Sequence, residues 1–190
     1  PAPHTTFIGS PTLAVLTSGD YVAGHDWFGP ATTYSLSSVF GSSDGGKTWH
    51  LGGYYPMQFS INTKCVLKTL PSGRVLLVAN DVQMKEESGK RIYYYTDENG
   101  LERELVTHKT ARTRMTAYLS DDDSKTFSHK MLLCDDGQIS YPSATLGKDG
   151  SIYIVYDQGR GVIGQHTIFL SNITEEDILA GKLVKSESFL

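Results

Sequence analysis

The chain has 190 residues, of which 39% are hydrophobic and 20% are charged, and its formal net charge is -4. This composition indicates one soluble globular domain and excludes a chain that is mainly disordered. Because 17 basic residues accompany 21 acidic ones without a long lysine or arginine run, we expect no nucleic-acid partner. The apolar runs are too short to span a bilayer, so we expect no membrane insertion.

The first predicted element is a hairpin over 13–26, in which two strand-like runs flank a short turn. Gly19 supplies the positive φ that a tight turn requires, and Asp26 ends the second strand seven residues later. A second turn pattern, Ser-x-Asp-x-Gly-x-Thr-Trp, follows over 42–49. Its aspartate can accept backbone N–H bonds while Trp49 tucks beneath as an apolar plug, so we interpret it as a structural turn.

The second unit repeats both patterns. Its hairpin covers 66–80, with a turn at Gly73 and an end at Asn80, again seven residues later. The turn pattern recurs over 120–127, where Ser124 replaces the glycine and a phenylalanine takes the aromatic position. The repetition is a stronger signal for a shared architecture than either copy alone.

An insertion separates the two patterns of the second unit. Residues 83–112 contain strand-like runs on both sides of an Asn99-Gly100 pair. This dipeptide favours a two-residue hairpin turn, so we predict an inserted hairpin with its turn at Asn99-Gly100.

The third unit begins with a hairpin over 143–157, which again has a turn glycine and ends at Asp157. A strand-like run over 167–172 follows. Thr174, with an aspartate three residues later, predicts the N-terminus of a short C-terminal helix over about 175–180.

The sequence contains none of the common cofactor motifs: no phosphate-binding glycine loop before a helix, no Gly-x-Ser-x-Gly elbow and no helically spaced histidine pair. The turn pattern already explains the acidic run over 121–123, so we predict no metal and no cofactor. Cys65 and Cys134 are interpreted as buried thiols, with one disulfide as the alternative. A removed secretory signal would leave no trace, so the compartment stays open, including a secreted or periplasmic location.

The chain is therefore predicted to be all-β, with three blade-like units over about 7–58, 62–133 and 138–185 in a single domain over 1–190. The two turn patterns resemble the Asp-boxes, or bacterial neuraminidase repeats, of the sialidase (neuraminidase) superfamily. In that family they decorate a six-bladed β-propeller. The likeness covers nearly the whole chain and implies a shortened or half propeller of about three blades. Two identical halves would close a ring, so a homodimer is an expected partner.

The resemblance also implies a site in which arginines grip a sugar carboxylate and a tyrosine acts as nucleophile. A guanidinium matches a carboxylate in a bidentate manner, and a neutral phenol attacks an anionic sugar without charge repulsion. Tyr141, at the family's Tyr-Ser-x-Leu position, is the candidate nucleophile. Asp26 is the candidate acid/base, because an acid beside aromatic rings can have the raised pKa that a general acid needs. His25 is a further catalytic candidate, and Trp27 is a candidate substrate-binding residue. Asp157 corresponds to the acidic residue that ends the family's last hairpin.

The arginine that precedes an Asp-box strand in the family corresponds to Arg114 or Arg112, which are candidates for binding the sugar carboxylate. Arg160, which follows the last hairpin, is a further substrate-binding candidate. The family's opening Arg-Ile-Pro is replaced by Gly-Ser-Pro over 9–11, so one expected arginine is absent. The glutamate that activates the tyrosine has no counterpart. For each candidate, an ordinary strand end, turn or surface charge is the alternative interpretation.

Two functions follow as expectations. The first is a retaining, exo-α-sialidase-like glycoside hydrolase that releases terminal acidic sugars. The second is a non-catalytic Asp-box module that binds a glycan or a protein through the aromatic residues Trp27, Phe28, Tyr54 and Tyr55. Convergence of Tyr141, Asp26 and Arg114 on one pocket would favour the enzyme.

Overall fold

The computed structural model describes residues 7–28, 37–51, 64–87, 90–96, 99–107, 112–159 and 167–190, and for 26–28, 37–38, 83–87, 90–96 and 105–107 only the backbone. The elements in these ranges are β1 (Phe7–Val15), β2 (Tyr21–Phe28), β3 (Ser37–Ser42), β4 (His50–Leu51), β5 (Val66–Thr69), β6 (Val75–Asn80), β7 (Gln83–Glu87), β8 (Lys90–Thr96), β9 (Glu102–Thr107), β10 (Met115–Ser120), β11 (His129–Cys134), β12 (Ile139–Leu146), β13 (Ile152–Gln158), β14 (Thr167–Ile173) and α1 (Glu175–Ala180).

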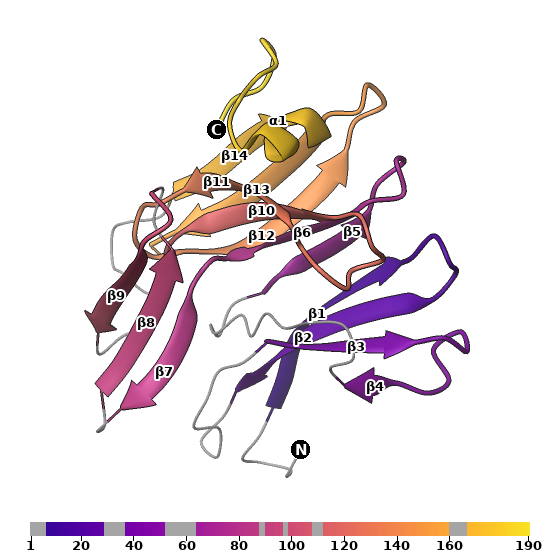
Figure 1. Cartoon of the computed structure of the whole chain (residues 1–190), viewed down its shortest axis with the longest axis horizontal. Helices are drawn as coiled ribbons and strands as arrows, with labels where there is room; N and C mark the ends of the chain where they lie inside the picture. Colours follow the sequence, from indigo (N-terminus) through magenta and orange to yellow (C-terminus); the bar gives the residue numbers. More distant parts are fainter. Residues whose placement is uncertain are drawn as a thin grey trace.

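The strands form four antiparallel sheets (Figure 1). The first sheet has the order β1-β2-β3-β4, the second β11-β10-β6-β5, and the third β12-β13-β14. Each of these three contains one of the predicted hairpins, whose turn glycines Gly19, Gly73 and Gly150 have φ values of 88°, 91° and 87°. The all-β fold with about three propeller blades and a short C-terminal helix is confirmed.

The fourth sheet, β7-β8-β9, is the insertion, and it stands apart from the other three (Figure 1). Its β8–β9 hairpin was predicted, and Gly100 in the connecting turn has a φ of 76°. The prediction missed β7, which pairs with β8 and makes the insertion a three-stranded sheet.

The second sheet is the middle layer of a stack of three. Every residue of β6 and β10 is buried. Because side chains alternate along a strand, Val75 and Leu77 face the core shared with the first sheet, while Leu76 and Val78 face the core shared with the third. The latter core also contains Ile178 of α1.

The two ends of the sheets differ in what they carry. The hairpin turns near 16–20, 70–74 and 147–151 lie at one end together with both Asp-box turns and α1, and we call this the turn end. The opposite end is formed by the starts of β1, β10 and β12 and by the ends of β2, β6 and β13. We call it the bulge end, and the insertion sheet leaves from it directly after β6.

The first Asp-box turn folds around Asp44. This carboxylate accepts hydrogen bonds from the backbone N–H groups of Lys47 and Thr48, each at 2.9 Å, and from the Thr48 hydroxyl at 2.6 Å. Ser42 donates its hydroxyl to the same carboxylate at 2.9 Å. These bonds, the Thr48 hydroxyl foremost, lower the pKa of Asp44 from 3.8 to about 2.

The second Asp-box turn has the same geometry. Thr126 donates both its backbone N–H and its hydroxyl to Asp122, each at 2.7 Å, and the Ser120 hydroxyl donates to Asp122 at 2.8 Å. Ser124 takes the glycine position with a φ of 69°, against 84° for Gly46 in the first turn. The prediction of two structural turns with one pattern is confirmed.

The aromatic residues of the two turns lie differently. Phe127 packs against the core between the first and second sheets and meets Tyr118 edge-on, with ring centroids 6.5 Å apart. Trp49 is 40% exposed, and its indole N–H donates to the Gly46 carbonyl at 3.0 Å. An apolar plug is therefore the right description for Phe127, whereas the hydrogen bond keeps Trp49 over its own turn.

The helix α1 begins at a capping box, as the sequence predicts. Thr174 accepts a bond from the Asp177 N–H at 3.3 Å, and the Asp177 carboxylate accepts one from the Thr174 N–H at 2.8 Å. Asp177 is fully buried and also accepts bonds from the Val184 N–H and the Ser188 hydroxyl, both at 2.6 Å. Burial alone would raise the pKa of Asp177, but these bonds outweigh it and lower the pKa to about 2.

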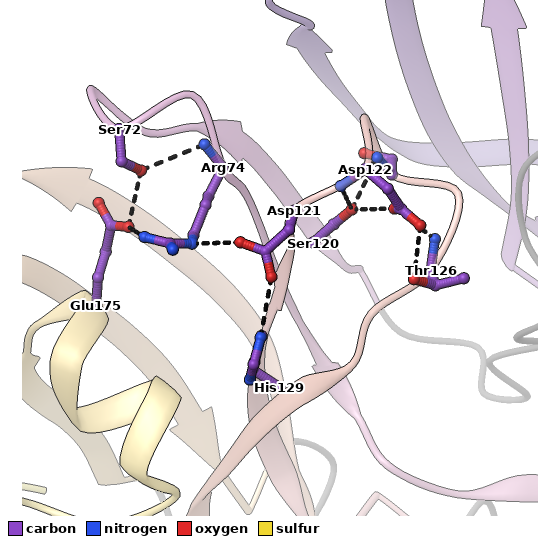
Figure 2. A network of polar contacts seen from close by, with 9 residues as sticks. Ser72, Arg74, Ser120, Asp121, Asp122, Thr126, His129 and Glu175 are labelled. Atoms are coloured by element: carbon purple, nitrogen blue, oxygen red, sulfur yellow. Dashed lines mark hydrogen bonds and ion pairs between the residues drawn. The ribbon is translucent and has the colours of Figure 1, made fainter.

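A polar network ties the turn end together (Figure 2). Arg74, in the β5–β6 turn, forms ion pairs with Asp121 at 2.6 Å and with Glu175 of α1 at 3.1 Å. The Ser72 hydroxyl donates to Glu175 at 2.7 Å, and His129 bonds to Asp121 at 2.9 Å. The network joins the second sheet, its Asp-box turn and the C-terminal helix.

Both cysteines are free thiols, so the alternative of a disulfide is wrong. Cys65 is buried, Cys134 is partly buried, and burial raises the pKa of the Cys134 thiol. Among the residues that the structure describes, no helix is long and apolar enough to cross a membrane.

Candidate functional site

Two edge strands carry the same bulge at the bulge end. In β1 the pairing passes from Gly9–Asp26 to Thr12–Gly24, and in β12 it passes from Ser140–Asp157 to Ser143–Val155, so two residues oppose one in each case. The first bulged residues, Ser10 and Tyr141, have φ values of 52° and 56°, and a proline follows each. Such bulges re-aim a side chain, and here they give Ser10 and Tyr141 equivalent places in the two sheets.

The bulge in β12 places Tyr141 next to an arginine. The guanidinium carbon of Arg112 lies 5.3 Å from the centroid of the Tyr141 ring, within the range of a cation–π contact. Arg112 also donates to the Ser140 hydroxyl at 3.3 Å, and this hydroxyl donates to the Asp157 carboxylate at 2.8 Å. Arg112, Ser140, Tyr141 and Asp157 therefore form one cluster, which we call the tyrosine cluster.

Hydrogen bonds to backbone groups hold the segment around Arg112 in this position. The Ile139 N–H donates to the Arg112 carbonyl at 2.8 Å. Asn80, which is buried at the end of β6, donates its amide to the Thr113 carbonyl at 2.7 Å and to the Ile139 carbonyl at 3.1 Å. Asn80 thus locks the strand ends of the second and third sheets together beneath the tyrosine cluster.

Sequence analysis named neither Ser140 nor Asn80 as a functional residue. Ser140 directly precedes the candidate tyrosine and pairs with Asp157 across the hairpin, and Asn80 is the polar end of the second hairpin. The polar residue that ends each hairpin in the sequence could have pointed to Asn80. Its hydrogen-bond partners on the neighbouring sheet, however, can be identified only from the structure.

Arg114 lies in a second, separate contact. It is 8% exposed, its φ is 55°, and its guanidinium forms an ion pair with Asp135 at 3.1 Å. Sequence analysis left Arg112 and Arg114 as alternatives for the arginine that precedes the Asp-box strand and binds the sugar carboxylate. The contact with the Tyr141 ring is made by Arg112, while Asp135 partly neutralises Arg114 from the adjoining loop.

The other predicted residues are placed only in part. His25 is half-buried and stacks on Phe40 of β3, with ring centroids 5.0 Å apart. The backbone of Asp26 pairs with Gly9 and Ser37 at the bulge end. The side chains of Asp26, Trp27 and Phe28, and all of Arg160, Tyr54 and Tyr55, lie outside the described residues. Convergence of Asp26 with Tyr141 therefore stays a prediction.

Two large grooves lie at the turn end, away from the tyrosine cluster. One, of about 560 Å³, is lined by residues of the first and second sheets that include Tyr21, His50 and Lys125. The other, of about 610 Å³, lies beside α1 and includes Arg74 and Glu175. Within the described ranges, no group of three or more His, Cys, Asp or Glu side chains could hold a metal ion.

Comparison with known proteins agrees with this architecture. The model of the BNR repeat-like domain family matches residues 32–154, which is more than half of the chain. The chain belongs to this family. The expected sialidase-type, Asp-box propeller resemblance is thereby confirmed, and no curated protein is significantly similar to the sequence.

Solved structures of similar fold are known for this BNR repeat-like chain. The GH93 α-L-arabinofuranosidase of Fusarium graminearum with arabinobiose is 14% identical, with a TM-score of 0.51, over 88% of this chain and 45% of that one. The F. graminearum α-L-arabinofuranosidase Arb93A with an iminosugar inhibitor is also 14% identical, with a TM-score of 0.51, over 92% and 46%. A Hadza microbial sialidase, Hz136, is 13% identical, with a TM-score of 0.29, over 92% and 54%. The BNR repeat-like chain thus spans about half the length of these structures.

Proposed function

We propose that the tyrosine cluster is part of a glycoside-hydrolase site that releases terminal acidic sugars by a retaining mechanism. The contact of the Arg112 guanidinium with the Tyr141 ring carries this proposal. It combines a nucleophile of the type that a BNR-repeat hydrolase would use with a fixed positive charge beside it. Glycoside hydrolases with the same fold support the class of reaction, since the F. graminearum enzymes are named for cleaving a sugar linkage.

In the proposed reaction, the Tyr141 oxygen attacks the anomeric carbon of the bound sugar and its phenol proton passes to solvent, while Asp26 donates a proton to the departing oxygen. A water molecule that Asp26 deprotonates then attacks the anomeric carbon and breaks the tyrosyl–sugar bond, and the released phenolate takes a proton back from solvent. The two inversions give net retention. A neutral phenol suits an acidic sugar, because a carboxylate nucleophile would be repelled by the sugar's own carboxylate.

Within the tyrosine cluster, a chain of hydrogen bonds positions the guanidinium of Arg112. Asp157 accepts the Ser140 hydroxyl at 2.8 Å, and Ser140 accepts Arg112 at 3.3 Å. Ser140 and Asp157 are therefore positioning residues, which hold the guanidinium at the ring. The guanidinium in turn binds the sugar carboxylate, with Arg114 as a second candidate whose charge Asp135 partly offsets.

The arginines favour an acidic sugar over a neutral one. One similar structure of F. graminearum carries arabinobiose, a neutral sugar without a carboxylate for a guanidinium to bind. A direct test compares hydrolysis of a fluorogenic sialoside and a fluorogenic α-L-arabinofuranoside. We expect the sialoside to be cleaved faster; faster cleavage of the arabinofuranoside would contradict the substrate class but retain the reaction class.

The role of Tyr141 is tested by Tyr141→Phe, with Tyr153→Phe as a matched control in the same sheet. We expect the first change to lower kcat by about 10³-fold or more, because the nucleophilic oxygen is lost, and the second to leave kcat unchanged. The measurement is sialoside hydrolysis, with circular dichroism to check the fold of both variants. Equal activity of Tyr141→Phe and the unchanged chain would exclude Tyr141 as the nucleophile.

A departure from the family pattern favours a second candidate function, a non-catalytic sugar-binding module. Gly-Ser-Pro over 9–11 stands where the resemblance implies Arg-Ile-Pro, so one arginine expected to bind the sugar carboxylate is replaced. This alternative predicts that sialic acid binds in titration calorimetry without hydrolysis. Binding would weaken in Arg112→Gln and persist in Tyr141→Phe.

A further inference from the structure

The first sheet has one covered face and one open face. Ala14, Val22 and Val39 point into the core shared with the second sheet. Their neighbours along the strands point the other way, and the register aligns four of them in a row across the whole sheet: Leu13, Ala23, Phe40 and Leu51. Leu13 is 54% exposed and Leu51 68%, so this apolar row meets water.

The third sheet is open on the other side of the stack. Ile152 and Ile154 face the core shared with the second sheet. The alternate positions carry Val155, which pairs with Leu170, and Ile168, with exposures of 40%, 47% and 78%. A contiguous apolar surface of this kind on a folded chain marks an interaction site.

The two open faces correspond to opposite faces of the repeated hairpin. One face of the hairpin packs on the following sheet and the other packs on the preceding sheet. Three residues beyond the turn glycine, Val22 and Leu76 each face the next sheet along the chain, and Tyr153 holds the same position in the third sheet. Four residues beyond the glycine, Leu77 and Ile154 each face the preceding sheet.

The same pattern of positions shows which kind of sheet face each open face would pack against. Ala23 of the first sheet stands at the position that faces a preceding sheet, and the open face of the third sheet is the one that faces a following sheet. The third-sheet face therefore fits the first-sheet face as the second sheet fits both of its neighbours.

We propose that two copies of this chain associate with the open face of each third sheet packed on the open face of the other copy's first sheet. The two faces favour a second copy as the occupant, because each copy carries one face of each type and the two types are complementary. Both interfaces form at once under a two-fold axis, so the ring closes without leaving an open face. This inference does not depend on the proposed catalysis.

The arrangement also bears on the candidate site. Asp157 lies on β13 opposite Ile168, at the edge of the open face of the third sheet. The first sheet of the second copy carries His25 on its open face, two residues after Ala23, and the Ser10 bulge at the same end. The tyrosine cluster thus lies at the border between the copies, and a site there includes residues of both.

The test uses the molar mass of the 190-residue chain, measured by light scattering during size exclusion, at several concentrations. We expect twice the 20.9 kDa of one chain. Leu13→Lys alters only the first-sheet face and Val155→Glu only the third-sheet face, and each places a charge in both interfaces of its own homodimer. We expect each variant to dissociate at least tenfold more readily than the unchanged chain.

Mixing the two variants distinguishes the proposed pairing from all others. In the mixed dimer one interface is unaltered and the other sets lysine against glutamate, so dimers should return. Leu101→Glu, at a 55% exposed position of the insertion turn, is the control and should stay dimeric. Circular dichroism establishes that each variant is folded, and Ile168→Glu replaces Val155→Glu if the latter unfolds.

A monomer at all concentrations, an open polymer, or a dimer that both variants leave unchanged would overturn the proposal. So would a mixture that stays monomeric while both variants are folded, because face-to-face pairing of like sheets gives no rescue. None of these readouts depends on hydrolysis, so failure of the dimer and failure of the proposed activity remain separate results.

Discussion

The turn end and the bulge end use polar groups in opposite ways. At the turn end, Asp44 and Asp177 receive several hydrogen bonds each from the protein, which lower the pKa of both to about 2. These carboxylates have a structural role, because their hydrogen bonds stabilise an Asp-box turn and the helix α1. At the bulge end, Arg112 lies over the ring of Tyr141, and its charge is directed at a side chain that a bulge has re-aimed.

Backbone strain is divided unevenly between the two ends. Among the described residues, those other than glycine with positive φ are Asp123 and Ser124 at the turn end, and Ser10, Arg114, Gln138 and Tyr141 at the bulge end. For a bulky residue such as Tyr141 this conformation costs about 1–2 kcal/mol, and it persists only where the surroundings enforce it. The comparison teaches that stability should depend on the turn end and chemistry on the bulge end.

The largest effect that would test this division is Arg112→Gln. We expect hydrolysis of a sialoside, as kcat/KM, to fall by about 10²-fold or more, because a charged donor for the substrate is lost. The free energy of unfolding in urea should change little, because the main-chain bond from Ile139 to the Arg112 carbonyl remains. A large loss of stability with full activity in the folded fraction would reverse the assignment of the two ends.

The reciprocal change at the turn end is Asp177→Asn. The carboxylate is fully buried and accepts hydrogen bonds from Thr174, Val184 and Ser188. In asparagine an NH2 group replaces one of the two acceptor oxygens, so at least one of these donors would face another donor. We expect unfolding to require about 3 kcal/mol less, measured in urea, with activity per folded molecule unchanged. Glu176→Gln, an exposed carboxylate of the same helix, is the control and should leave stability nearly unaltered.

The pH dependence sharpens the same prediction. The pKa of Asp177 is about 2 in the folded chain and 3.8 as its ordinary value, so its stabilisation is complete above about pH 4. It is lost as the pH falls toward 2, where both states bind the proton, and amounts to about 2 kcal/mol. In Asp177→Asn, the free energy of unfolding measured in urea should therefore change less between pH 4 and pH 2 than in the unchanged chain. The same pH dependence in both would show that other carboxylates cause it.

Local patterns made most of the turn end predictable from the sequence. The two Asp-boxes and the capping box at Thr174 each need only residues within eight positions of one another, and their hydrogen bonds formed as expected. Trp49 differed because its indole bonds to its own turn, which no pattern of apolar residues encodes.

The bulge end was predictable only in outline. Tyr141 and Asp157 were named from a resemblance, but the choice of Arg112 next to the ring depends on Asn80, which is 59 residues away from its partner Ile139. Such contacts between sheets have no local signature. The strand β7 was missed although a Ser-Gly pair separates it from β8 in the sequence, because this pair is a weaker hairpin signal than the Asn-Gly pair that follows β8.

The smallest expected effect concerns backbone strain in the second Asp-box turn. Ser124 occupies the Asp-box glycine position with a φ of 69°, and its buried hydroxyl oxygen has no hydrogen-bond partner among the described residues. Ser124→Gly relieves both costs at once, so we expect about 1 kcal/mol of added stability in urea unfolding. Gly46→Ala, in the other Asp-box at φ 84°, should lower stability instead. If both changes destabilise, the serine makes a compensating contact, and the two Asp-boxes are not equivalent in their demand for a left-handed residue.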